Sequence, residues 1–343
     1  MTARAAILPA FAVVALACSS APAPAPAPAA AARIVERARV SMGSEVRLTA
    51  WTADEPNVLL AFEHIFDDFE HLDRVLSVWH ANSEISKLNA AAGMAPVTLE
   101  PEVIEVLQIA QQVSGWTGGK FDVTFGALSG LWRFDHDQDN RIPPARDVAA
   151  RLPLVDHAAL EIDGRRNTAF LRRAGMRVHM GGIGKGFAVD RAATMLRSHG
   201  IEDFLVQAGG DLYASGRRGD RPWRAAIRDP RGDGSFAAMD LVDTTLTTSG
   251  DYERFFIENG RRYHHILDPD TGEPARGSRS VTIVTDRAVI ADALSTGVFV
   301  MGPRPGMALI EKLPDVEGVI VSESGEVLVS SGLRGRLELK SAR

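Results

Sequence analysis

The stretch from position 176 to 199, MRVHMGGIGKGFAVDRAATMLRSH, changes its hydrophobic period in the middle. Residues 176–180 alternate as in a strand, whereas residues 188–199 carry apolar side chains at helical spacing. Glycines fill most of the segment 181–186 between them, and Lys185 lies near its end. The sequence therefore predicts a strand, a glycine loop and a helix, whose N-terminal N–H groups can hold a phosphate.

This glycine loop matches neither of the two common nucleotide-binding motifs. Gly186 stands where a P-loop has Ser or Thr, and Phe187 occupies the last glycine position of the dinucleotide fingerprint. A tight strand-to-helix turn, in which the glycines only permit positive φ, explains the segment nearly as well. Its function depends on the motifs around it.

The rest of the chain reads as strands in hairpin-like succession with helices inserted between them. Strands are predicted at 39–51, 203–207, 223–228, 262–267, 280–285, 318–322 and 326–330. Helices are predicted at 57–78, 101–114, 289–300 and 305–312. This mixture favours an α+β fold with mixed or antiparallel sheets over an alternating parallel one.

The N-terminus has the features of an export signal. Arg4 precedes an apolar run that ends at Cys18, so residues 1–17 are predicted to be a signal peptide. The run is shorter than the roughly 20 residues of a membrane-spanning helix. A protein exported to the periplasmic face of a bacterial membrane is expected.

Cys18 is the single cysteine and lies where the lipidated cysteine of a bacterial lipoprotein would lie. The preceding Ala15-Leu16-Ala17 departs from the usual order of that signal, so a lipid anchor and a soluble exported protein both stay open. The Ala/Pro tract that completes residues 18–32 predicts an extended linker. Residues 33–343 are expected to form one folded domain.

Composition narrows the function classes. A net charge of −6 argues against a broad basic surface, and therefore against nucleic-acid binding. The chain contains neither a Gly-x-Ser-x-Gly elbow nor a His-Glu-x-x-His helix, which removes the commonest hydrolase and zinc-protease readings. Its chemistry must depend on oxygen ligands, glycines and histidine.

Two patterns suggest a metal and a proton acceptor. Asp292 and Thr296 are four residues apart on a predicted helix, so their oxygens share a face and could hold Mg²⁺, with Ser295 close by. Helix capping by Asp292 and back-bonding by Thr296 explain an isolated pair better. His264 and His265 alternate on a predicted strand, so at most one of them is expected to face a site.

Eight blocks of sequence, taken in order, resemble the ApbE family of FAD:protein FMN transferases. The blocks are Met42–Gly43, Ser83–Ser86, Gly119–Thr124, Gly184–Asp190, Ala208–Gly210, Thr248–Gly250, His265–Pro269 and Asp292–Thr296. The resemblance extends from Val40 to Gly302, and ordered blocks are far more specific than a single glycine loop.

The resemblance implies a T-fold-like α+β domain that binds FAD as substrate and Mg²⁺ at its pyrophosphate. Such a domain transfers FMN to a threonine of an acceptor flavoprotein, often a subunit of a membrane redox complex, and releases AMP. By the same resemblance, the positions that contact FAD are Met42, Trp79, Lys120, Phe121, Asp122, Lys185 and Ile266.

The resemblance also assigns the metal ligands and the proton acceptor. The metal positions are Gly182, Asp292, Ser295 and Thr296, and His265 matches the family histidine beside the phosphoryl group. His179 stands where the family commonly has Asp, which leaves one nucleotide contact open. Two other functions stay open: an FAD pyrophosphatase that gives FMN and AMP, which would use the same residues, and an FAD-binding lipoprotein without catalytic activity, against which Asp292, Thr296 and His265 count.

Overall fold

A computed structural model of the protein describes residues 31–135 and 137–340. The predicted signal peptide, Cys18 and all but the end of the predicted linker lie outside the described residues. The chain from Ala31 onward forms one compact unit. None of the helices in the described part of the chain combines the length and the apolar character that a membrane span requires.

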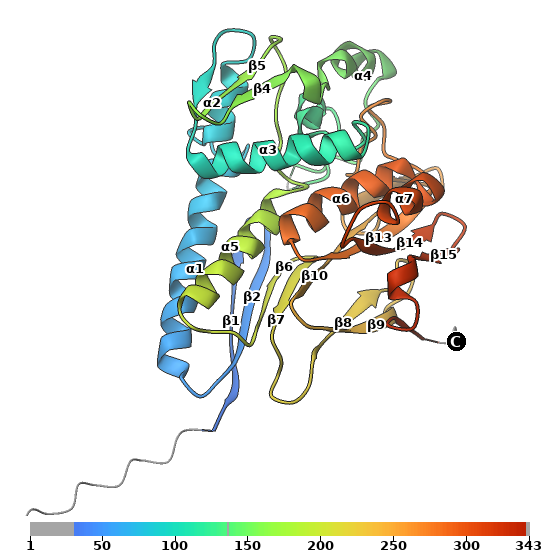
Figure 1. The fold of residues 1–343 in the computed structure, drawn as a ribbon. Helices are drawn as coiled ribbons and strands as arrows, with labels where there is room; N and C mark the ends of the chain where they lie inside the picture. The colour runs from blue at the N-terminus through green and yellow to red at the C-terminus, as the bar shows by residue number, and fades with distance from the viewer. Residues whose placement is uncertain (1–30, 136, 341–343) are drawn as a thin grey trace, which may run out of the picture. The chain divides into compact units, whose positions relative to one another are not determined.

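The centre of the unit is an eight-stranded sheet in the order β1-β2-β6-β7-β10-β13-β14-β15 (Figure 1). Every neighbouring pair in it is antiparallel. Its strands are β1 (Arg33–Ser41), β2 (Ser44–Thr52), β6 (Phe204–Ala208), β7 (Asp211–Ser215), β10 (Thr244–Gly250), β13 (Ser278–Thr285), β14 (Glu317–Ser322) and β15 (Val327–Val329). The antiparallel pairing confirms the predicted α+β class.

Four helices pack on one face of this sheet (Figure 1). They are α1 (Glu55–Leu76), α5 (Gly184–Ser198), α6 (Ala288–Met301) and α7 (Pro303–Ile310). Helix α1 begins where Asp54 accepts a hydrogen bond from the N–H of Asn57, and its apolar stripe fully buries Phe62 and Phe69. Helices α5 and α6 also pack on each other, which brings the glycine loop next to Asp292.

A smaller sheet covers part of the other face of the large one. It consists of β16 (Glu338–Leu339), β9 (Ser235–Leu241) and β8 (Trp223–Arg228). Ile283 of β13 packs into the helix-side core while its neighbour Val284 packs into a second core with Trp223 and Met239. Because successive strand residues face opposite sides, β13 is buried on both faces, between helices and the small sheet.

The remaining elements lie around these layers. Helix α3 (Pro101–Trp116) packs on α6, close to α2 (Glu84–Ala90) and a sheet of β3 (Val97–Thr98), β5 (Thr168–Leu171) and β4 (Leu160–Asp163) (Figure 1). The others are η1 (Val123–Leu128), α4 (Ala145–Arg151), η2 (Leu152–Leu154), η3 (His157–Ala159), η4 (Ser331–Leu333) and the hairpin of β11 (Phe255–Glu258) with β12 (Arg261–His264).

Two predicted strands are wrong in instructive ways. The predicted strand 39–51 is a hairpin, because Met42 and Gly43 both adopt positive φ, 49° and 71°, and form a two-residue turn. The segment 176–180 is no strand, because Val178 exchanges hydrogen bonds of 2.6 and 3.0 Å with the side chain of Asn89. A side-chain amide there satisfies the backbone that a neighbouring strand would otherwise pair.

Candidate active site

The glycine loop ends at the first turn of α5, which begins at Gly184. Ile183 occupies the N-cap position and offers no side-chain acceptor. The N–H of Gly186 instead donates to Asp292 Oδ2 at 2.9 Å. The remaining first-turn amides and the partial positive charge of the helix N-terminus favour an anion here.

Close backbone approach explains why two of the loop positions are glycine. A Cβ on Gly186 would lie 2.3 Å from the carbonyl oxygen of Ala288 and 2.7 Å from Asp292 Cβ. A Cβ on Gly182 would lie 3.4 Å from both Thr296 Oγ1 and Phe121 Cε2. Gly186 thus permits α5 to touch α6, and Gly182 brings the loop backbone beside Thr296.

A buried charge cluster lies at the start of α5. Lys185 Nζ is 3.0 Å from Asp211 Oδ2 and 3.6 Å from Asp292 Oδ2, and the two aspartates are only 1% and 4% exposed. Asp211 Oδ2 accepts no aligned hydrogen bond from any described residue, although the ammonium is near. Two carboxylates facing one ammonium leave a net negative charge that a cation would compensate.

The pKa values in this cluster reflect that imbalance. Burial, and then the charge of Asp211, raise the pKa of Asp292 above its usual range, while Lys185 opposes the rise. Burial acts to lower the pKa of Lys185, but Asp211 and Asp292 outweigh it and keep that pKa high. Lys185 therefore stays protonated, and Asp292 is the carboxylate most in need of another positive charge.

Hydroxyl groups complete a set of oxygen donors. Ser249 Oγ lies 2.8 Å from Ser295 Oγ and 3.2 Å from Thr296 Oγ1, while Ser295 also donates to the carbonyl of Asp292 at 2.9 Å. Carboxylate and hydroxyl oxygens are the donors that Mg²⁺ prefers. The two buried carboxylates that share one ammonium, and the absence of a side chain at Gly182 beside Thr296, both fit a hard cation beside the loop.

The two neighbouring histidines differ in their surroundings. His264 is buried, and its Nε2 lies 3.0 Å from the carbonyl of Ala275; burial lowers its pKa to about 4. His265 is half-buried one residue past β12, with Nδ1 3.3 Å from the carbonyl of Arg254. Burial, then the charge of Arg254, lower the pKa of His265 well below its usual value, with a smaller effect from Lys185. His265 is therefore neutral at pH 7 and can accept a proton.

Residues 120–122 have three separate environments. Phe121 is buried against Gly182, whereas Lys120 Nζ lies 2.8 Å from Asp268 and 2.9 Å from Asp270. Asp122 accepts from the N–H of Thr124 at 2.7 Å and from the N–H of His157 at 2.8 Å. Each oxygen of Asp122 therefore accepts a hydrogen bond from the backbone of the protein itself.

The other predicted contact positions lie on several elements. Met42, in the β1–β2 turn, has its Cε 3.5 Å from where a Cβ on Gly184 would lie. Trp79 follows α1 and is 54% exposed, while Ile266 is buried and accepts from the N–H of Ala275 at 2.9 Å. Met42 therefore borders the glycine loop directly.

His179, at the position where the resemblance expects an aspartate, contacts the loop. Its Nδ1 accepts a hydrogen bond from the N–H of Gly181 at 3.0 Å, and its ring packs near that of Phe125. Burial lowers the pKa of His179 to about 4, so the ring is neutral at pH 7. It therefore orders the loop without adding a charge.

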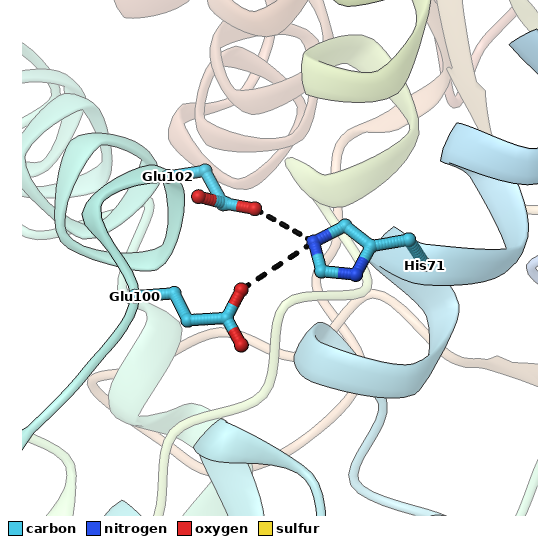
Figure 2. Close-up of side chains that lie close together, drawn as sticks. All are labelled: His71, Glu100 and Glu102. Atoms are coloured by element: carbon cyan, nitrogen blue, oxygen red, sulfur yellow. Dashed lines mark hydrogen bonds and ion pairs between the residues drawn. The ribbon is translucent and has the colours of Figure 1, made fainter. Parts of the chain in front are cut away.

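A histidine and two glutamates, His71, Glu100 and Glu102, lie close together between α1 and the start of α3 (Figure 2). The sequence did not predict this group. His71 Nε2 is 2.7 Å from Glu102 Oε1 and 3.4 Å from Glu100 Oε2. Within residues 31–135 and 137–340, these three side chains are the set of His, Cys, Asp or Glu residues whose ligand atoms lie close enough together to hold a metal ion. Since His71 Nε2 is hydrogen-bonded to Glu102 and within ion-pair distance of Glu100, these contacts already account for the geometry, and the group shares no residue with the predicted metal set.

Sequence reasoning missed two members of the cluster. Asp211 lies directly after Gly209-Gly210, and Ser249 lies in the Thr248–Gly250 block. Both segments stand out in the sequence, but their side chains gain a role only when β7 and β10 pack beside α5 and α6. The structure places Lys185 Nζ 3.6 Å from Asp292 Oδ2, and Ser295 and Thr296 follow Asp292 on helix α6.

An antiparallel α+β fold with a glycine loop facing buried carboxylates defines the class of this protein. The model of the ApbE family matches residues 42–320, and the chain belongs to the ApbE family. It is 32% identical to an FAD:protein FMN transferase of Treponema pallidum, with 91% of each chain covered. It is 30% identical to one of Klebsiella pneumoniae, covering 89% of this chain and 94% of the relative.

Solved structures agree with the sequence comparison. The ApbE protein of Thermotoga maritima superposes with a TM-score of 0.82 at 32% identity, covering 89% of this chain and 99% of the other. The flavin transferase ApbE of Vibrio cholerae gives 0.80 at 29% identity over the same shares. The resemblance inferred from the eight blocks is thereby confirmed.

Proposed function

We propose that this chain is a Mg²⁺-dependent FAD:protein FMN transferase, which cleaves FAD and attaches FMN through a phosphoester to a threonine of an acceptor flavoprotein. One observation carries the proposal: two buried carboxylates, Asp211 and Asp292, share the single ammonium of Lys185 beside a glycine loop that favours an anion. A cation and a pyrophosphate together would satisfy both halves of this arrangement. The names of the high-coverage relatives support the same activity.

Four positions would hold the metal: Asp292, Ser295, Thr296 and the backbone of Gly182. When bound, Mg²⁺ would supply positive charge at the pyrophosphate and so favour departure of AMP. The first-turn amides of α5 and the ammonium of Lys185 would bind the remaining phosphate oxygens. The flavin half would lie against Met42, Trp79, Phe121 and Ile266, with Lys120 near the polar edge.

The transfer step breaks the phosphoanhydride bond of FAD and forms a phosphoester with the acceptor. The threonine oxygen of the acceptor attacks the phosphorus of the FMN half, and the bond from that phosphorus to the bridging oxygen breaks, so AMP leaves with the electron pair. The hydroxyl proton goes to His265, whose lowered pKa keeps the imidazole neutral and ready at pH 7. Arg254 holds that ring through its carbonyl oxygen.

Export and lipid anchoring at Cys18 form part of the proposal. The Ala/Pro segment would act as a tether that places the enzyme near flavinylated subunits of membrane redox complexes. These two features depend on the N-terminal sequence pattern alone.

A gel assay tests the transferase function against its two alternatives. The chain is incubated with FAD, Mg²⁺ and an acceptor domain, and flavin fluorescence of the acceptor is read after denaturing electrophoresis, with Asp292→Ala as control. A fluorescent acceptor, absent in the control, supports transfer. FMN and AMP without labelled acceptor indicate a pyrophosphatase, and intact bound FAD indicates a binding protein; either result contradicts the proposal.

A further inference from the structure

A cavity of about 500 Å³ lies beside β12 and is bordered by His264, the residue next to the proposed proton acceptor. Five arginines line it: Arg231, Arg261, Arg262, Arg276 and Arg279. The acidic side chains of its lining are Asp251 and Glu323. None of these residues belongs to the proposed flavin or metal site, and so many positive charges are unexpected in a protein of net charge −6.

Only part of this positive charge is neutralised by carboxylates. Arg231 binds Asp251 in a bidentate pair with distances of 2.7 and 2.6 Å, which occupies both oxygens of that carboxylate. Arg261 reaches Glu273 only at 3.8 Å. Arg262 and Arg276 form no ion pair with a carboxylate among the described residues within 4.0 Å.

Aromatic rings and backbone carbonyls position these two guanidinium groups instead. Arg262 lies 3.6 Å from the centre of the Phe255 ring and donates to the carbonyl of Asp251 at 3.4 Å. Arg276 lies 5.7 Å from the ring of Tyr263 and donates to the carbonyl of Arg262 at 3.2 Å. A guanidinium has five N–H donors, and ring stacking uses its face, so most donors stay available for an anion.

Buried polar atoms in the lining also lack partners. Ser278 is 4% exposed, and its Oγ forms no hydrogen bond with any described residue. Arg279 donates from Nη2 to the carbonyl of Glu323 at 2.6 Å, but its buried Nε has no partner among those residues. Buried polar atoms are rarely left unpaired, so these two point to a ligand.

We propose that this cavity is a second binding site, for a small oxyanion with two or more phosphate or carboxylate charges, held by Arg262, Arg276 and the Ser278 hydroxyl. Its volume falls in the range of small-molecule pockets, about 300–1,000 Å³. Burial lowers the pKa of Arg262, and burial together with Arg261 lowers that of Arg276, so both cations would gain from a bound anion.

Calorimetric titration of the mature chain without Mg²⁺ tests the proposal, with inorganic pyrophosphate and citrate as separate probes. We expect at least one probe to bind, and the tighter one identifies the preferred charged group. The double variant Arg262→Gln/Arg276→Gln should weaken binding at least about tenfold, and Ser278→Ala about threefold, because charged hydrogen bonds are lost. Arg262→Lys/Arg276→Lys should recover part of the affinity.

Two controls separate this cavity from other anion sites. Arg221→Gln removes an exposed arginine of which the side chain is 84% accessible, and should leave the affinity unchanged. Lys185→Gln alters the glycine-loop cluster, which would itself bind pyrophosphate, so this control is read with citrate, whose affinity should stay unchanged. Equal affinity in the double Gln variant, loss of citrate binding in Lys185→Gln, or no heat with either probe at about millimolar concentration overturns the proposal. Unfolding curves of each variant confirm that the protein compared is folded.

Discussion

Asp122 and Asp211 are both buried, yet their surroundings treat the two carboxylates differently. Both oxygens of Asp122 accept backbone N–H groups, from Thr124 and His157. Asp211 is held instead by an ion pair: its Oδ2 lies 3.0 Å from the ammonium of Lys185, which a second buried carboxylate, Asp292, shares. A buried carboxylate whose two oxygens accept backbone N–H groups stabilises the fold, whereas two carboxylates that share one ammonium are suited to binding a further cation.

The largest expected effect comes from removing the charge of Asp292. Asp292→Asn should lower the rate of FMN transfer about 100- to 1000-fold, because it removes a proposed metal ligand and its electrostatic contribution. Its melting temperature should not fall, because the substitution relieves repulsion with Asp211. If the melting temperature fell together with the activity, Asp292 would stabilise the fold, as Asp122 does, and the loss of activity would not show a role in the transfer.

Two glycines of the same loop should separate packing from chemistry. Gly186→Ala should reduce the free energy of unfolding by about 2–3 kcal/mol, because its Cβ would lie 2.3 Å from a backbone oxygen of α6. Gly182→Ala meets Thr296 at 3.4 Å, so it should leave stability nearly intact and reduce Mg²⁺-dependent transfer about tenfold. Denaturant melts and transfer rates of both variants check this, and equal losses of stability would contradict it.

Asp122→Asn tests whether the Asp122 carboxylate stabilises the fold. Asparagine keeps one acceptor oxygen and loses the second, so the free energy of unfolding should fall by about 2 kcal/mol. The transfer rate of the folded variant should fall far less than in Asp292→Asn. Asp156→Asn, which changes a more exposed cap at η3, is the matched control and should cost less stability. A thousandfold loss of activity without loss of stability would show that the Asp122 carboxylate binds substrate.

The smallest expected effect concerns pH. Because His265 has a pKa held well below its usual value, its basic form persists at pH 6, and transfer should decline only at lower pH. Arg254→Gln removes a positive charge that lowers this pKa, so the acidic limb of the pH–rate profile should move upward. An unchanged limb would show that another group sets it, and His265→Gln should then retain activity.

Strong periodicity made much of the fold predictable. The helix predicted at 57–78 is α1 (Glu55–Leu76), and the strand predicted at 223–228 is β8 (Trp223–Arg228). The glycine loop and its helix also lie as expected. In contrast, β10 (Thr244–Gly250) was missed, because its sequence TTLTTSG has one large apolar residue and gains its burial from neighbouring strands.

The site residues that lie within sequence motifs were predictable, and the contacts between distant elements were not. Lys185, Asp292, Ser295 and Thr296 lie in motifs that are visible in the sequence, whereas the pairing of Lys185 with Asp211 requires strand β7 beside α5. Asp122 shows the opposite limit: its motif position suggests flavin contact, yet local backbone groups use its carboxylate. The partners of a buried carboxylate are set by the folded chain, so the sequence could not distinguish Asp122 from Asp211.

The most direct measurement compares Asp292→Asn with Asp122→Asn in the acceptor-labelling assay, at equal concentrations of folded protein. Covalent flavin fluorescence on the acceptor should disappear from the Asp292→Asn reaction and persist, at reduced thermal stability, in the Asp122→Asn reaction. Full labelling by Asp292→Asn would contradict the central claim that the carboxylate cluster at the glycine loop is required for the transfer.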